Sequence, residues 1–365
     1  MSEPDSGVTS LFETLVREPA SGDAPETGRR RRRRWPVVVG VLVVVALGVA
    51  GAGWFAVRAA VARYDKNIER FGDPFAQIPA TERPAPPAAA TGAMNVLLLG
   101  SDSRISAGDP TQWVAGAQRT DAIMLVHVQA DRKGVYVISI PRDSWVPIPG
   151  HGTAKINAAF SWGGPALMVR TVEQLTGVHV DHLAIADFDG FKQLTDDLGG
   201  VDLTVAKATH DERGTWTAGV HHMNGDQALK YVRQRHNLPG GDFDRVRRQQ
   251  AWLRSVVGRL GATGTLTNPV ALNNALNTLS KSVATDSGFS MDEIGDLVTS
   301  LAKLDKGQLR FFTMPTAGGG TSSDGQEYVK VDTKGAGQLF DAVEKDQVHQ
   351  WIATYRPELL GTVVR

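Results

Sequence analysis

Short apolar runs alternate with amphipathic stretches over most of residues 94–355. Runs typical of buried strands occur at 94–99 (MNVLLL), 122–128 (AIMLVHV) and 135–140 (VYVISI). The second and third runs are joined by residues 129–134, a connection of hairpin length that ends in glycine. The same pattern predicts further strands, at 182–185, 201–205, 309–314 and 328–331.

Helical spacing of apolar residues appears between these strands. Residues 165–175 carry it, a second helix is expected at 188–198, and residues 243–260 form a strongly amphipathic helix. Two or three more helices are expected between 268 and 304, and closing helices at 337–343 and 348–355. Strands interleaved with helices predict an α/β fold in layers.

One apolar run is too long for a strand. Residues 37–57 contain 21 residues without a charge, which as a helix extend roughly 31 Å, enough to cross a bilayer core. Arg29 to Arg34 precede this run, and positive residues stay on the cytoplasmic side. We therefore expect a disordered cytoplasmic tail at 1–34 and a transmembrane helix at 35–58, with the rest of the chain extracytoplasmic. A cleaved signal peptide is the alternative, but its apolar region would be shorter.

The stretch after the apolar run has the composition of a spacer. Residues 59–93 start with a polar stalk and continue through a segment rich in proline and alanine. We expect the folded domain to occupy 94–365.

Composition changes this picture little. Lysine and arginine number 39, as do aspartate and glutamate, so net charge does not favour nucleic acid. The absence of cysteine excludes a disulfide framework and thiolate chemistry. The histidines do not form a spaced metal-binding motif, and neither a G-x-S-x-G elbow nor a phosphate-binding P-loop is present.

Charged residues gather at the ends of the first three predicted strands. Strand 94–99 runs into Gly-Ser-Asp-Ser-Arg (100–104), strand 122–128 follows Arg-Thr-Asp (119–121), and strand 135–140 runs into Pro-Arg-Asp-Ser (141–144). If these strands are antiparallel neighbours, the charged groups share one sheet edge. The residues concerned are Asp102, Arg104, Arg119, Asp121, Arg142 and Asp143.

This combination of carboxylates and arginines is suited to a phosphorylated ligand. Asp102 and Asp121 can hold a hard cation such as Mg²⁺, which takes phosphate oxygens as its remaining ligands. Arginines can grip the same phosphates with two hydrogen bonds each. Unrelated surface salt bridges at the three strand ends are the alternative.

A second basic cluster follows in residues 231–250, with five arginines between 233 and 248. Asp242 is a natural N-cap for the helix that starts there, and a helix N-terminus attracts anions. Arg248 and Gln249 follow Arg245 by three and four positions and are expected on one face with it. A solvated basic helix and a nucleic-acid surface are the alternatives. The predicted topology argues against nucleic acid, because this loop would face away from the cytoplasm.

The motifs resemble those of the LytR–CpsA–Psr family of cell-wall glycopolymer ligases. The resemblance rests on NVLLLGSDSR (95–104), QRTDAIMLVHV (118–128), SIPRDSWVPIPG (139–150) and KINAAFSWGG (155–164). It continues through 176–203 and 223–250, in family order, with a motif core of 94–258. It implies an α-β-α layered domain with a central mixed sheet and a deep apolar groove for a polyprenyl chain.

The resemblance also implies roles for individual residues. Asp102 and Asp121 match the aspartates associated with Mg²⁺ (or Mn²⁺), and Asp242 matches the acidic residue of the arginine loop. Lys155 matches a lysine of the site, and Asp244 departs from the glycine that the family often has there. The residues that match the pyrophosphate-binding positions are Arg119, Arg142, Arg233, Arg235, Arg245 and Gln249.

The function that follows is a Mg²⁺-dependent phosphotransferase anchored in the cell membrane. It would ligate a polyprenyl-diphosphate-linked glycan, of teichoic acid, arabinogalactan or capsule type, to peptidoglycan. Arg119, Asp121, Asp242 and Arg245 are the expected catalytic residues, with Asp121 and Asp242 both open as general base. A polyprenyl-diphosphate pyrophosphatase and a membrane-anchored regulator or binding protein are the alternatives.

Overall fold

The protein is described from a computed structural model. The described residues are 70–87, 92–101, 120–234, 236–262, 277–278, 280–281, 283–305 and 307–361. Predicted features at 1–58 therefore lie outside them, as does the part of the predicted helical region at 263–276. Among the described helices, none combines the length and the apolar character needed to span a bilayer.

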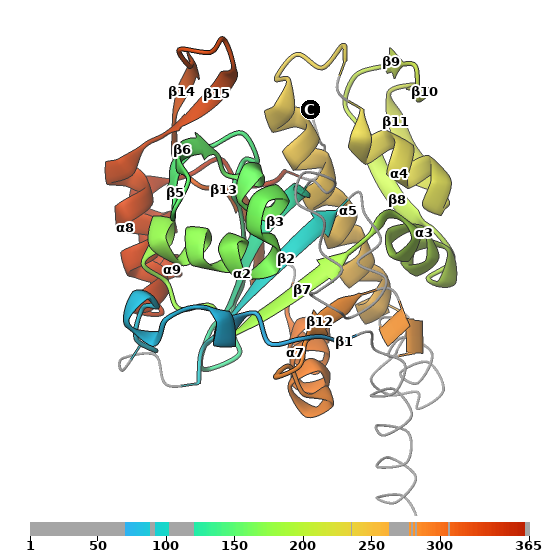
Figure 1. Cartoon of the computed structure of the whole chain (residues 1–365). Helices are drawn as coiled ribbons and strands as arrows, with labels where there is room; N and C mark the ends of the chain where they lie inside the picture. The colour runs from blue at the N-terminus through green and yellow to red at the C-terminus, as the bar shows by residue number, and fades with distance from the viewer. Residues whose placement is uncertain are drawn as a thin grey trace, which may run out of the picture. The chain divides into compact units, whose positions relative to one another are not determined.

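Within the described part of the chain, seven strands form a mixed central sheet in the order β1-β12-β7-β2-β3-β4-β13 (Figure 1). The strands are β1 (Arg70–Phe71), β2 (Met94–Ser101), β3 (Thr120–Val128), β4 (Val135–Ser139), β7 (His182–Ala186), β12 (Ala284–Asp286) and β13 (Leu309–Thr313). β3 is antiparallel to both β2 and β4, whereas β7 is parallel to β2 and β13 is parallel to β4. The predicted hairpin at 129–134 is confirmed, since Val128 pairs with Val135.

Helices cover both faces of this sheet. α2 (Asn157–Thr176), α8 (Thr333–Glu344) and α9 (Val348–Tyr355) lie on one side, and α5 (Asp242–Ala262) and α7 (Met291–Lys303) lie on the other (Figure 1). The alternation along β2 explains both layers, because successive side chains point to opposite faces. Leu97 and Leu99 are fully buried in the core shared with α2, α8 and α9, whereas Val96 and Leu98 face α5 and α7. The α-β-α layering expected from the sequence is confirmed.

The remaining elements form smaller units beside the sheet. α3 (Phe188–Asp197), α4 (Gly225–Arg233) and α5 pack around the hairpin of β8 (Val201–Val205) and β11 (Gly219–Met223). β9 (Thr209–Asp211) pairs with β10 (Gly214–Trp216), β5 (Trp145–Ile148) with β6 (Gly152–Lys155), and β14 (Thr316–Thr321) with β15 (Glu327–Val331). The predicted strand at 201–205 exists but joins β11 rather than the central sheet.

Residues 70–87, which the sequence analysis placed in a spacer, pack on the domain instead. β1 pairs with β12, and the short 3₁₀ helices Phe75–Gln77 and Ala80–Glu82 follow it. Ile78 is 6% exposed, and the Arg83 guanidinium forms a two-pronged pair with the buried Glu173 carboxylate at 2.7 Å. The described structure therefore starts before the boundary expected near Ala93.

A polar network joins the C-terminal end of β3 to the connection between α8 and α9. His127 is fully buried, with Nδ1 at 2.8 Å from Asn95 Oδ1 and Nε2 at 3.0 Å from Asp346 Oδ1. The Ala130 N–H donates to the other Asp346 oxygen at 3.1 Å. Burial acts to raise the pKa of Asp346, but the hydrogen bonds from His127 and Ala130, with the attraction of the His127 ring, lower it overall.

This network predicts an acid-sensitive contribution to stability. A carboxyl group with a lowered pKa in the folded state stabilises the fold above its unfolded pKa, about 3.9, and loses that contribution as pH falls through the folded value. The melting temperature of the wild type should therefore fall more steeply below about pH 4 than that of Asp346→Asn. Asparagine tolerates the positive φ of 55° at this position. Melting curves recorded against pH test this, and equal slopes for the two proteins would contradict it.

Candidate active site

The strand ends that carry charged residues meet at one edge of the sheet. β2, β4, β7 and β13 end there and β3 begins there, because β3 is antiparallel to its two neighbours. Asp121, at the start of β3, and Arg142 and Asp143, after β4, are thereby brought together as the sequence analysis predicted. Asp102, Arg104 and Arg119 lie outside the described residues.

Asp121 occupies a β-bulge. Gly100 pairs with Ala122 and Ser101 pairs with Thr120, so β3 has one more residue than β2 at this point, and that residue is Asp121. A bulge bends the strand and changes the direction of a side chain, and bulges are common beside active sites. The bulge lets the Asp121 carboxylate leave the regular alternation that buries Ile123 and Leu125 in the core below.

Two guanidinium groups bind the Asp121 carboxylate. Arg142 Nη1 lies 2.5 Å from Asp121 Oδ1, and Arg245 Nη1 lies 3.8 Å from the same oxygen. Arg245 Nη2 is 2.6 Å from Asp242 Oδ1, and Arg142 Nη2 is 3.5 Å from that oxygen. Two carboxylates and two guanidiniums thus form one continuous cluster, which we call the charged cluster (Asp121, Arg142, Asp242 and Arg245).

The first two turns of α5 supply the second carboxylate and the second guanidinium of the charged cluster. The helix begins at Asp242 itself, and Arg245 follows one turn later with only 2% of its surface exposed. Gln249 lies one further turn along, and its Nε2 donates to the Asp121 backbone carbonyl at 3.4 Å. The second oxygen of Asp242 is buried and accepts no hydrogen bond from the described residues. α5 therefore presents a desolvated cation, a carboxylate and an amide to the same edge.

A second ion pair continues the site toward β5 and β6. Asp143 Oδ1 lies 3.4 Å from Lys155 Nζ, and Asp143 Oδ2 lies 3.6 Å from Arg142 Nε. Lys155 ends β6, so the small hairpin delivers its ammonium to the same rim. Lys155 is thus part of the assembly, as expected.

Arg233 approaches the rim from another direction. It is the last residue of α4, and its guanidinium lies 4.0 Å from the centre of the Phe188 ring. This cation–π contact holds the charge at the wall of a groove. Arg235 lies outside the described residues.

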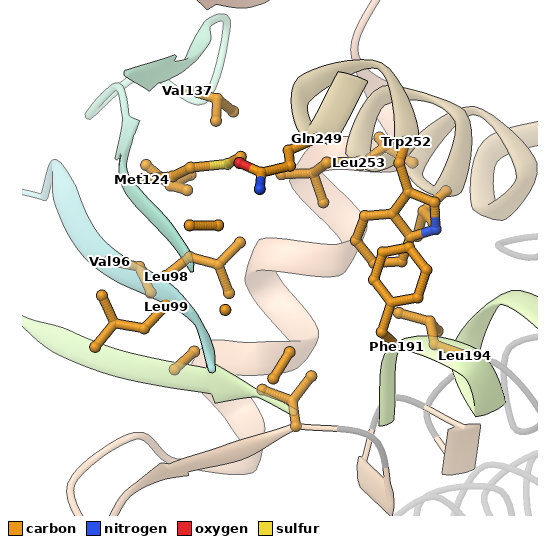
Figure 2. A pocket seen from close by; sticks show the side chains of 18 of the residues that line it. Val96, Leu98, Leu99, Met124, Val137, Phe191, Leu194, Gln249, Trp252 and Leu253 are labelled. Atoms are coloured by element: carbon orange, nitrogen blue, oxygen red, sulfur yellow. The ribbon is translucent and has the colours of Figure 1, made fainter. Parts of the chain in front are cut away.

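An apolar groove of about 280 Å³ opens beside the charged cluster. Figure 2 shows side chains from β2, α3 and α5 pointing into it, with the stacked rings of Phe191 and Trp252 on one wall. α7 and β13 contribute Ile294, Leu297 and Phe311. Asp121, Arg233 and Gln249 also line it, so the groove is continuous with the charged site.

Arg248 does not share the face of Arg245 and Gln249 that its spacing suggested. It is 2% exposed and turns toward α4, with its guanidinium 4.1 Å from the centre of the Tyr231 ring. It donates to Gln234 Oε1 at 2.6 Å and to Thr209 Oγ1 at 3.1 Å. Each helical residue advances by about 100°, so Arg248 lies about 60° around the helix from Arg245 and about 100° from Gln249. This angle lets Arg248 face the interior while the other two face the rim.

An apolar groove was expected, but its individual wall residues were not predicted from the sequence. On α5 the wall is formed by Trp252, Leu253, Val256 and Val257. In the sequence these residues form two adjacent apolar pairs, 252–253 and 256–257. Such pairs widen the apolar face of a helix beyond what one packed neighbour covers. The contributions of α7 and β13 depend on contacts that are distant in sequence.

The donor set is compatible with a magnesium ion but does not form a complete site by itself. Among the described residues, no group of three or more histidine, aspartate or glutamate side chains is placed to hold a metal. Mg²⁺ in phosphoryl-transfer sites uses one or two carboxylates, with waters and substrate phosphates as the other ligands. Asp121, partly exposed at 12% beside two guanidiniums, fits that limited role.

The domain thus has α-β-α layers, with the charged cluster at the mouth of an apolar groove. The LytR_cpsA_psr family matches this chain over residues 60–345. The chain belongs to the LytR–CpsA–Psr family.

Curated relatives and solved structures agree with this assignment. The cell wall biosynthesis protein LcpA of Corynebacterium glutamicum is 34% identical over 67% of this chain, and the probable cell wall biosynthesis protein LcpB of that organism is 36% identical over 77%. The matches span 54% and 65% of the lengths of LcpA and LcpB. The regulatory protein MsrR of Staphylococcus aureus is 36% identical over 45% of this chain and 48% of its own length.

Two solved structures show the same fold. Bacillus subtilis TagV has a TM-score of 0.59 and 24% identity, covering 70% of this chain and 97% of its own. A LytR–Csp2A–Psr enzyme from Actinomyces oris has a TM-score of 0.60 and 22% identity, covering 76% and 96%. At these identities the likeness establishes the architecture alone.

Proposed function

We propose that the protein is a cell-wall glycopolymer ligase that acts as a phosphotransferase. Its donor would be a glycan linked through a diphosphate to a polyprenyl carrier, and its acceptor would be a hydroxyl of peptidoglycan. LcpA and LcpB, named as cell wall biosynthesis proteins, support the assignment to cell-wall assembly. A TagT structure with the same fold is described as bound to LI-WTA.

One observation supports the donor most strongly. The groove and the charged cluster share Asp121, Arg233 and Gln249, so an apolar chain and its anionic head group can bind side by side. The groove wall consists mainly of aliphatic and aromatic side chains, which gain from burying an apolar chain. Guanidinium groups at its mouth are suited to the oxygens of a diphosphate.

The reaction would be a displacement at phosphorus. The acceptor hydroxyl oxygen forms a bond to the glycan-side phosphorus while the bond from that phosphorus to the bridging oxygen breaks, and polyprenyl phosphate leaves. Arg142 and Arg245 would balance the charge that develops on the transferred group and the leaving phosphate. The hydroxyl proton passes to a carboxylate, either Asp121 or Asp242, and a loose transition state requires little assistance from a base.

Magnesium would act with the arginines at the same phosphates. Asp121 is the described residue suited to hold it, and Asp102 is its proposed companion from the sequence motif. When bound, the ion would neutralise charge on the diphosphate oxygens. Arg104, Arg119 and Arg235 remain proposed phosphate ligands on the basis of the sequence.

The membrane anchor belongs to the same proposal. The apolar run at 37–57 with its preceding arginines would tether the domain outside the cytoplasm, next to a substrate whose carrier stays in the bilayer. A cytoplasmic location for residues 94–365 would contradict this and would favour a regulator.

The deciding experiment is a transfer assay with the full chain purified in detergent, a polyprenyl-diphosphate-linked glycan, Mg²⁺ and peptidoglycan. We expect covalent attachment of the glycan by the wild type and a loss of at least about 100-fold in Asp121→Asn. Asp226→Asn, an exposed aspartate paired with Lys230 on α4, is the matched control and should transfer normally.

Other outcomes of the assay separate the alternatives. A donor with a shortened prenyl chain should show a higher KM, because it leaves the groove partly empty. Release of glycan phosphate without attachment would favour a pyrophosphatase. Absence of any reaction with lipid-linked glycans would favour a binding protein.

A further inference from the structure

A pair of stacked aromatic rings lies outside the groove, with one ring on a strand that follows Arg142 of the charged cluster closely in the chain. Trp145 begins β5, three residues after Arg142, and its ring stacks on that of Tyr328 from β15 with the centroids 4.6 Å apart. Neither ring lines the groove. Both side chains are half-buried, so part of this aromatic surface is open to solvent.

Backbone contacts fix this pair to the charged rim. The Val329 N–H donates to the Asp143 carbonyl at 2.8 Å, and Ser144 bridges to Val329. Across the small hairpin, Trp145 pairs with Lys155, whose ammonium binds Asp143. The aromatic pair therefore cannot move independently of the residues at the site.

The strand next to Tyr328 lacks side chains where the ring lies. Gly320 pairs with Tyr328, and a Cβ at Gly320 would come within 2.6 Å of the tyrosine ring. A bare backbone at this position lets the ring lie against β14. This close fit indicates a ring held in place before any ligand arrives.

A second aromatic pair lies at the other end of the same hairpin. His151, in the turn between β5 and β6, contacts the ring of Trp162 from α2 at 5.2 Å, and Trp162 is 40% exposed. Along β5, Val146 and Ile148 are buried in the core, whereas Trp145 and the exposed Pro147 occupy the outer face. Three strand residues, about 10 Å, separate Trp145 from the turn that carries His151.

We propose that these two aromatic pairs, Trp145–Tyr328 and His151–Trp162, form the subsite for the sugar chain that carries the accepting hydroxyl. The C–H faces of sugar rings pack against the negative faces of aromatic rings, and Asp143 and Lys155 offer partners for ring hydroxyls. The inference rests on the proposed function. It places the lipid-linked donor in the groove and the acceptor glycan along β5, outside the groove.

The test is direct binding, which does not require turnover. Soluble, un-cross-linked peptidoglycan strands are titrated calorimetrically into the full chain in detergent, without donor. We expect Trp162→Ala and Trp145→Leu each to raise the Kd about tenfold. Tyr355→Ala, an exposed aromatic on α9 that is 41% exposed, is the matched control and should bind as the wild type does.

Each result supports or overturns the subsite. Equal affinity in Trp162→Ala and the wild type, or no binding by the wild type, would overturn it. If Trp145→Leu fails to fold, Trp162→Ala still decides, because its ring is exposed. Loss of binding to anionic lipid vesicles with unchanged glycan affinity would instead assign the rings to a membrane surface.

Transfer kinetics distinguish this inference from the proposed function. Trp162→Ala and Trp145→Leu should raise the KM for acceptor strands in the transfer assay, whereas Tyr355→Ala should keep the wild-type KM. A wild type that binds strands but neither transfers nor cleaves the donor would refute the proposed function and leave the sugar subsite standing.

Discussion

Replacing Arg245 with alanine is expected to lower the rate of glycan transfer by roughly 10²–10³-fold, and replacing it with lysine should recover only a small part of that loss. The guanidinium is almost fully buried and is held by Asp242 at 2.6 Å and by Asp121 at 3.8 Å. A positive charge fixed in a desolvated place stabilises developing phosphate charge without reorganisation. Lysine supplies the charge but not the planar, two-pronged geometry.

The measurement is kcat/KM for transfer, with melting temperatures recorded beside it. Arg259→Ala is the matched control, since Arg259 lies on the same helix, is 33% exposed and pairs with Asp202. It should retain normal transfer. A folded Arg245→Ala protein with wild-type kcat/KM would remove the charged cluster from the mechanism.

Replacing Arg248 with methionine is expected to reduce the free energy of unfolding by about 1–3 kcal/mol while changing the site little. Burial lowers the pKa of Arg248, and the attraction of Tyr231, Asp244 and Asp211 partly offsets this. The side chain nevertheless satisfies Gln234, Thr209 and the Tyr231 carbonyl. Methionine fills much of the space but removes the guanidinium donor from Thr209 Oγ1, and it leaves Gln234 Oε1 and the Tyr231 carbonyl with one donor each, from Thr209 Oγ1 and the Gln234 N–H.

Chemical denaturation with an unchanged m-value would measure this loss. Arg259→Ala is the matched control here too, because Arg259 is 33% exposed and its partner Asp202 is 51% exposed. It should lose no more than about 1 kcal/mol. Equal losses in the two variants would contradict the structural role assigned to Arg248.

The meeting of charged strand ends could be predicted from the sequence because it needs only local information. Three apolar runs, one short connection and the alternation of direction place Asp121, Arg142 and Asp143 at one edge. The bulge at Asp121 could not be predicted in this way, because it depends on which residues of β2 and β3 pair. Spacing predicted Arg245 and Gln249 correctly but placed Arg248 on the wrong face.

The groove and strand β1 could not be predicted, because both depend on contacts between residues that are distant in the sequence. The groove walls come from β2, α3, α5, α7 and β13, and Val96 on β2 and Phe311 on β13 are more than two hundred positions apart in the chain. Residues 70–87 have the proline content of a spacer, yet β1 completes a sheet edge offered by β12. The proline content of residues 70–87 indicates how this segment would behave in isolation. Its packing depends on the free edge of β12, which the composition does not reveal.

Helix α5 has a mechanical consequence for the proposed reaction. Its first two turns carry Arg245 and Gln249, and its later turns carry Trp252, Val256 and Leu260 in the groove wall. Because both sets of residues belong to one continuous helix, a shift of its later turns also shifts its first two turns. A substitution that displaces the groove-wall turns of α5 is therefore expected to displace Arg245 as well.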